Sequence, residues 1–144
     1  MLALTFQVGP DRVAVDVRRV HEVVPRVRLT PATGGPAWVA GVFVYRGRVV
    51  PVIDLHRLTG AGECPPHLSS RIILIPHPTD PDALVGLLAT QVADIRELPE
   101  PPARGEPGAP TLGPAIADGT DVLRLLDPDR FLPALGPALT GARP

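Results

Sequence analysis

The sequence has few aromatic residues and a single cysteine, and its charges nearly cancel. Phe, Trp and Tyr make up 3% of the 144 residues, so a core must be built from Val, Leu and Ile. The one cysteine, Cys64, cannot form an internal disulfide, which is typical of proteins from a reducing compartment. The net charge of −1 provides no electrostatic footprint for nucleic acid or for an anionic membrane surface.

Long apolar runs and a basic leader are also lacking. The longest uncharged stretch, residues 30–45, is broken by prolines and glycines and is shorter than the roughly 20 residues that a transmembrane helix needs. The N-terminus has no basic region ahead of its apolar residues, so no secretory signal peptide is predicted. These features predict a cytoplasmic protein without direct membrane insertion.

The chain is rich in proline and glycine, which number 20 and 14 and separate short apolar runs. Strands are expected at 2–8, 12–17, 27–29, 40–45, 48–53, 71–75, 84–89 and 121–126, with 92–98 as strand or turn. Short helices or helical turns are expected at 18–24, 54–59 and 128–135. The proline-rich residues 99–114 predict an irregular connection. Together these segments predict one all-β domain, a barrel or sandwich.

Residues 38–55, WVAGVFVYRGRVVPVIDL, are the most informative stretch. Two apolar runs flank Arg46 and Gly47, and Gly47 can adopt the positive φ that a tight hairpin turn needs. Runs this apolar are typical of strands covered on both faces, so the hairpin is expected to be buried. Arg46 stands at its tip, either as a solvated charge or as a contact for a partner.

No group of residues predicts catalysis or metal binding. The sequence contains four histidines, His21, His56, His67 and His77. They lack metal-ligand spacing, and Cys64 stands alone. Asp54 and His56 leave a small hydrolase as a remote alternative, although no GxSxG nucleophile motif accompanies them. We interpret Asp54 as the cap of the helical turn that follows it. The sequence has no GxGxxG or P-loop motif for a cofactor.

Five segments, in order along the chain, carry a resemblance to a known family. LTFQVGPDRVAVDVRRVHEVV is similar to an opening hairpin followed by a valine-x-glutamate-valine turn. WVAGVFVYRGRVVPVIDL contains glycine, apolar residues, arginine-glycine and then proline-valine-isoleucine-aspartate-leucine. RIILI, LVGLLATQVADIREL and LGPAIADGTDVLRLLD follow. This order resembles the CheW-like adaptor family of bacterial chemosensory systems over residues 2–135.

The resemblance implies an all-β fold of two intertwined, SH3-like, five-stranded barrel lobes that share an apolar core. Short helical turns and a short C-terminal helix would complete it, with residues 1–144 forming a single domain. Family members are not enzymes and carry no cofactor. The implied function is that of a non-catalytic adaptor that couples transmembrane chemoreceptors to a CheA-type histidine kinase. An adaptor or scaffold in an accessory, non-motility chemosensory pathway is the alternative.

Carried over by position, the resemblance implies partner binding by Val20, Glu22, Gly41, Arg46 and Gly47. The implied partners are the cytoplasmic tip of a chemoreceptor and the regulatory domain of the kinase. We expect the protein to be a monomer when free and to act at membrane-associated receptor arrays. Thr90 stands where the family often has an aspartate, so a charge pairing made by that carboxylate is lost.

Overall fold

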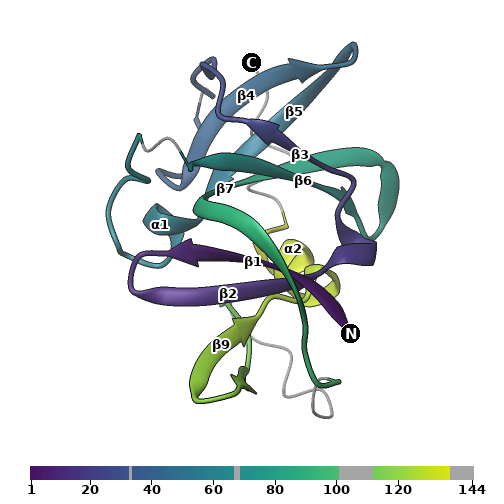
Figure 1. Ribbon diagram of the computed structural model, residues 1–144. Coiled ribbons are helices and arrows are strands. Elements are labelled where there is room, and N and C mark those ends of the chain that lie inside the picture. Colours follow the sequence, from purple (N-terminus) through teal and green to yellow (C-terminus); the bar gives the residue numbers. More distant parts are fainter. Residues whose placement is uncertain (33, 67–68, 101–111, 137–144) are drawn as a thin grey trace.

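The structure is a computed structural model that describes residues 1–32, 34–66, 69–100 and 112–136 (Figure 1). Within these ranges the elements are β1 (Leu2–Val8), β2 (Asp11–Asp16), the 3₁₀ turn η1 (Val17–Arg19), β3 (Glu22–Pro25), β4 (Val39–Tyr45), β5 (Arg48–Asp54), α1 (Leu55–Leu58), β6 (Arg71–His77), β7 (Asp80–Glu97), β8 (Ala115–Asp118), β9 (Asp121–Leu125) and α2 (Pro128–Leu135). Strands dominate, which confirms the predicted all-β class. Most of the predicted proline-rich connection, and His67, lie outside the described residues.

The strands form two lobes that share the long strand β7 (Figure 1). The central lobe contains β3, β6, the first half of β7, β5 and β4. The terminal lobe contains the second half of β7, β1, β2, β9 and β8. Because the first and last strands of the chain build one lobe and the middle strands the other, the lobes are intertwined. Two intertwined five-stranded lobes are what the family resemblance implied.

The crossing point of β7 lies at Thr90 and Gln91. Gln91 has a φ of 50°, and the pairing of β1 with β7 shifts register between Thr5 and Gln7. The Thr90 hydroxyl donates a hydrogen bond of 3.2 Å to the backbone oxygen of Gln7, which ties the two strands together at the shift. Thr90 therefore has a structural role of its own, without the charge that an aspartate would bring.

One apolar cluster joins the two lobes, and α2 closes it. Its buried members are Leu4, Phe6, Val8, Val13, Val15, Ile53, Leu55, Ile73, Ile75, Val85, Leu87, Ala89, Val92, Leu112, Leu126, Phe131, Leu132 and Leu135. Each fully buried Val, Leu, Ile or Phe side chain contributes about 1.5–3 kcal/mol to folding. Pro128 begins α2 and Gly136 follows its end, as predicted. The shared apolar core is thus confirmed.

Three local predictions are wrong. The helical turn expected at 18–24 is only the short η1, and Glu22–Pro25 instead pairs with β6 as β3. The strand expected at 27–29 is absent from the described residues, where Thr30 forms only an isolated bridge to Val42. The strand β8 (Ala115–Asp118) was not expected. Glu22–Pro25 is a strand because the distant β6 lies beside it, whereas β8 pairs with its neighbour β9 in a local hairpin. No helix in the described ranges is long and apolar enough to cross a membrane.

Candidate docking surface

The β4–β5 hairpin extends outward from the central lobe and ends at Arg46 and Gly47 (Figure 1). Arg46 has a φ of 48° and Gly47 a φ of 80°, so both central residues of the turn are left-handed, as in a type I′ turn. The sequence predicted the positive φ of Gly47 but not that of Arg46. A left-handed conformation costs a residue with a side chain about 1–2 kcal/mol, and Asn or Gly is favoured there. A strained residue at an exposed tip is a reason to look for a function.

The turn brings Arg46 beside Glu22, the first residue of β3. The Tyr45 hydroxyl donates a hydrogen bond of 2.7 Å to Oε1 of Glu22, and Nη2 of Arg46 lies 3.3 Å from the same oxygen. The Arg46 guanidinium carbon lies 5.2 Å from the centre of the Tyr45 ring. We call these three residues the Glu22–Tyr45–Arg46 cluster. The sequence singled out both charges, but it gave Tyr45 no role.

The two charged residues of the cluster are exposed to solvent, and the tyrosine that contacts both of them is buried. The side chain of Arg46 is 73% exposed and that of Glu22 is 39% exposed, whereas Tyr45 is buried. An ion pair this exposed contributes about 0–1 kcal/mol to stability. The hydrogen bond to Glu22 raises the pKa of Tyr45, because a phenolate beside a carboxylate is disfavoured. The cluster therefore adds little to folding, and its charges remain available to a partner.

Two valines leave an apolar surface on the outer half of the hairpin. Val44 pairs with Val49, and they are 69% and 52% exposed. The expectation of a hairpin buried on both faces is therefore wrong for this half. The physical reason is that β5 meets β7 only from Val52 to Asp54, so the outer half has no covering strand. Exposed apolar side chains next to an arginine are typical of protein-binding surfaces.

Val20 and Gly41 lie outside the cluster. Val20 follows η1 and packs, half-buried, against the shared core. Gly41 has a φ of 149°, and a Cβ there would lie 2.5 Å from the backbone oxygen of Thr30. Thr30 and Val42 exchange two backbone hydrogen bonds of 2.8 Å at this point. Close packing of the backbone thus accounts for the glycine, and partner binding by Val20 and Gly41 stays a prediction.

Replacing Gly41 with alanine is expected to lower the free energy of unfolding by about 1–2 kcal/mol, because the added methyl group meets backbone that cannot move aside. Urea denaturation measures this change. Gly47→Ala is the matched control, since Gly47 also has a positive φ but no atom lies within 4 Å of its would-be Cβ. Equal losses in the two variants would show that φ alone, and not the contact with Thr30, determines the cost.

Asp54 caps α1 and closes the loop that follows it. Its Oδ1 accepts hydrogen bonds from the backbone N–H groups of His56 (2.9 Å) and Arg57 (3.3 Å). Its Oδ2 accepts a third, of 2.9 Å, from the backbone N–H of Cys64. The predicted role as a cap is confirmed, and the bond to Cys64 extends it.

Asp54→Ala is expected to reduce stability by about 1–2 kcal/mol, because these N–H groups lose their acceptor. Thermal unfolding followed by circular dichroism measures the loss. Asp127→Ala, at the cap of α2, is a suitable comparison because the Asp127 carboxylate accepts a single backbone hydrogen bond within the described residues, from the N–H of Asp129. A smaller loss of stability for Asp54→Ala than for Asp127→Ala would show that the hydrogen bond from Cys64 to Asp54 does not stabilise the loop after α1.

The hydrolase alternative finds no support in the geometry of Asp54 and His56. Desolvation lowers the pKa of His56, and burial together with Asp54 raises the pKa of the neighbouring Cys64 thiol to about 11. The thiol is therefore protonated at neutral pH and is a poor nucleophile. The Asp54 carboxylate accepts hydrogen bonds from three backbone N–H groups and makes none to the His56 imidazole within the described residues.

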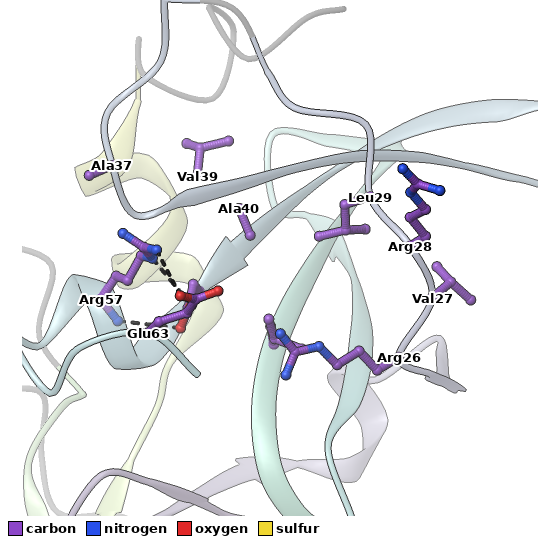
Figure 2. Close-up of a pocket in the computed structure, with 11 residues that line it drawn as sticks. Arg26, Val27, Arg28, Leu29, Ala37, Val39, Ala40, Arg57 and Glu63 are labelled. Atoms are coloured by element: carbon purple, nitrogen blue, oxygen red, sulfur yellow. Dashed lines mark hydrogen bonds and ion pairs between the residues drawn. The ribbon is translucent and has the colours of Figure 1, made fainter. Parts of the chain in front are cut away.

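A pocket with a volume of about 440 Å³ lies beside α1 (Figure 2). Nη2 of Arg57 lies 3.3 Å from Oε2 of Glu63. Nη1 of Arg26 donates to the backbone oxygens of Cys64 (3.1 Å) and Pro65 (2.8 Å). Nothing in the sequence indicated this pocket, because its walls come from four separate segments of the chain.

The exposed Glu22–Tyr45–Arg46 cluster and the uncovered valines are features typical of small β proteins that bind other proteins. Residues 2–135 match the CheW-like domain family, and the chain belongs to this family. The predicted family is thereby confirmed, and with it, at the level of the family, the predicted function of a chemosensory adaptor.

Three known proteins show how close the similarity is. The chain is 35% identical to protein FrzA of Myxococcus xanthus over 134 residues, which cover 88% of this chain and 82% of FrzA. It is 25% identical to chemotaxis protein CheW of Treponema pallidum over 135 residues, or 86% and 77% of the two chains. Its fold is similar to that of the scaffolding protein TtCheW from Thermoanaerobacter tengcongensis, with a TM-score of 0.70, 24% identity and coverage of 88% and 83%. The predicted fold class is confirmed.

Proposed function

We propose that this chain couples the cytoplasmic tip of a transmembrane chemoreceptor to the regulatory domain of a CheA-type histidine kinase and catalyses no reaction. It acts as one domain, is a monomer when free, and works in the cytoplasm at membrane-associated receptor arrays. The observation that carries this proposal is the Glu22–Tyr45–Arg46 cluster, which stands on a chain of the CheW-like family.

Each residue of the docking surface has a distinct task. The Arg46 guanidinium has five N–H donors, and those not directed at Glu22 can bind a carboxylate of the partner in a planar, two-pronged contact. Glu22 accepts donors from the partner. Gly47 has no side chain and no atom within 4 Å of its would-be Cβ, so a partner backbone can approach closely. Val44 and Val49 supply the apolar contact that removes water around the charges.

Two residues support this surface from within the fold. Val20 packs on the shared core just before β3 begins, and so fixes where Glu22 lies. Gly41 lets the base of the hairpin close against Thr30, and so fixes the direction in which the tip extends. Their contribution to partner binding is therefore indirect.

Affinity capture of the tagged chain from its own cells, followed by mass spectrometry, tests the proposal. We expect a chemoreceptor and a CheA-type kinase to be recovered together, and we expect both to be depleted when Arg46→Glu is the bait. Recovery of neither protein, with the bait folded and expressed, would overturn the proposal.

An accessory, non-motility chemosensory pathway is the second candidate. It is consistent with the relatives, which include protein FrzA at 35% identity, a protein not named as a chemotaxis protein, beside proteins that are, at 25% and 32% identity. Deletion of the gene distinguishes the two candidates. Unchanged spreading of the cells in soft agar would favour the accessory pathway, and a loss of directed spreading would favour a motility array.

A further inference from the structure

Three donor side chains of different chemistry meet in the interior where α1 begins. Asp54, His56 and Cys64 each offer a ligand atom, and these atoms all lie within 4.8 Å of one another. All three residues are buried. The cluster escaped sequence reasoning because Cys64 reaches it through the loop after α1, at a spacing that no metal motif shares.

His56 gives an independent indication that this cluster holds a ligand. The residue is only 4% exposed, and its Nδ1 has no hydrogen-bond partner among the described residues. Buried polar atoms are almost always paired in folded proteins, so an unpaired ring nitrogen needs an explanation. The lone pair of a neutral imidazole nitrogen is a common metal ligand.

We propose that Asp54, His56 and Cys64 form a binding site for a borderline-soft transition-metal dication, with Zn²⁺ as the best match. Imidazole nitrogen, thiolate sulfur and carboxylate oxygen are the three ligand types that zinc takes in proteins. A carboxylate and a thiolate together balance the two positive charges of the ion. With three protein ligands, the fourth position of a tetrahedral ion is left for water. The site is separate from the docking surface and does not rest on the proposed function.

The site lies next to a pocket and has a defined proton balance. Asp54 lines the pocket of about 440 Å³ (Figure 2), but its side chain is only 2% exposed, so an ion that enters from the pocket requires a local shift of the side chains around Asp54. As the sulfur–metal bond forms, the S–H bond of Cys64 breaks and its proton leaves to solvent. No electrons are transferred in this step.

Two features predict weaker binding than that of a structural zinc site. Nε of Arg57 lies 3.8 Å from Oδ2 of Asp54, and Arg26 donates to the backbone oxygen of Cys64. These two guanidinium groups place positive charge beside the site, and this charge repels a metal cation. Ligand atoms around a tetrahedral zinc ion are roughly 3.3–3.8 Å apart, so ligand atoms that lie up to 4.8 Å apart here would have to move closer together.

Titration of the reduced, metal-free full chain with Co²⁺ tests the site. We expect a thiolate-to-cobalt charge-transfer band, together with the visible bands of a tetrahedral ion, that saturate at one equivalent and disappear when Zn²⁺ is added. In weakly buffered solution near neutral pH, each bound ion should release about one proton from the wild-type chain.

Variants assign the ligands. Cys64→Ser and His56→Gln should each weaken Co²⁺ binding at least tenfold, and Cys64→Ser should also abolish the charge-transfer band. His77→Gln, at the end of β6, is the matched control and should bind as the wild type does. The proposal is overturned if the wild type shows no charge-transfer band at millimolar Co²⁺, or if binding survives unchanged in both folded variants. Because the band and the proton release are measured on the wild type, a variant that fails to fold leaves the test intact.

Discussion

Replacing Arg46 with glutamate is expected to weaken the binding of receptor and kinase roughly 10- to 100-fold while the fold stays intact. Arginines at the centre of protein interfaces typically contribute 1–3 kcal/mol, and this substitution also sets a second carboxylate beside Glu22. The exposed ion pair that is lost contributes at most about 1 kcal/mol to folding. Titration calorimetry with the purified partner domains measures the affinity, and thermal unfolding checks the fold.

Two further variants separate a specific contact from general electrostatics. Arg48→Glu makes the same charge change two residues along the hairpin, at an arginine that donates instead to the backbone oxygen of Asp82. We expect Arg48→Glu to weaken binding much less. Arg46→Asn removes the cation but suits the left-handed turn, so stability should stay within about 1 kcal/mol while binding falls. Equal losses for Arg46→Glu and Arg48→Glu would mean that net charge, not the cluster, attracts the partner.

Replacing Val52 with aspartate is expected to unfold the protein. Val52 is fully buried in β5, between Gly41 of β4 and Gly86 of β7. The site has no spare room, since even a Cβ at Gly86 would lie 3.1 Å from Cγ2 of Val52. An unpaired carboxylate here costs on the order of 4–5 kcal/mol or more, which is comparable to the total stability of many domains of this size. Circular dichroism and the yield of soluble protein report the loss.

Val44→Asp is the matched control for Val52→Asp, because it places the same carboxylate on the exposed part of the same hairpin. We expect Val44→Asp to fold normally and to weaken partner binding, since Val44 belongs to the apolar part of the docking surface. A Val52→Asp protein that melts at the wild-type temperature would refute our description of the core. Normal partner binding by Val44→Asp would remove the valines from the docking surface.

Local patterns in the sequence predicted the parts of this fold that depend on neighbouring residues. The hairpin turn at Arg46 and Gly47, the cap at Asp54, and the helix between Pro128 and Gly136 follow from the preferences of a few adjacent residues. The hydrophobic patterns predicted most strands for the same reason. The order of those segments then indicated the family, and the resemblance to that family implied the two-lobed arrangement.

Contacts between distant residues could not be predicted in this way. Val20, Val23 and Val24 have the spacing of a helix, but Val23 and Val24 form a strand because Ile73 and Ile72 of β6 lie opposite them. The burial of the hairpin was overestimated, since composition does not reveal where the covering strand ends. The pairing of Tyr45 with Glu22 and the approach of Cys64 to Asp54 both arise from the chain folding back on itself.

If this chain physically joins a chemoreceptor to a histidine kinase, the kinase should bind receptor-containing membranes only when the chain is present. Co-sedimentation of the kinase with such membranes, with and without the purified chain, measures this binding. We predict that the kinase pellets with the membranes when the wild-type chain is present and stays in the supernatant when the chain is omitted or carries Arg46→Glu. Equal sedimentation of the kinase with and without the wild-type chain would contradict the account.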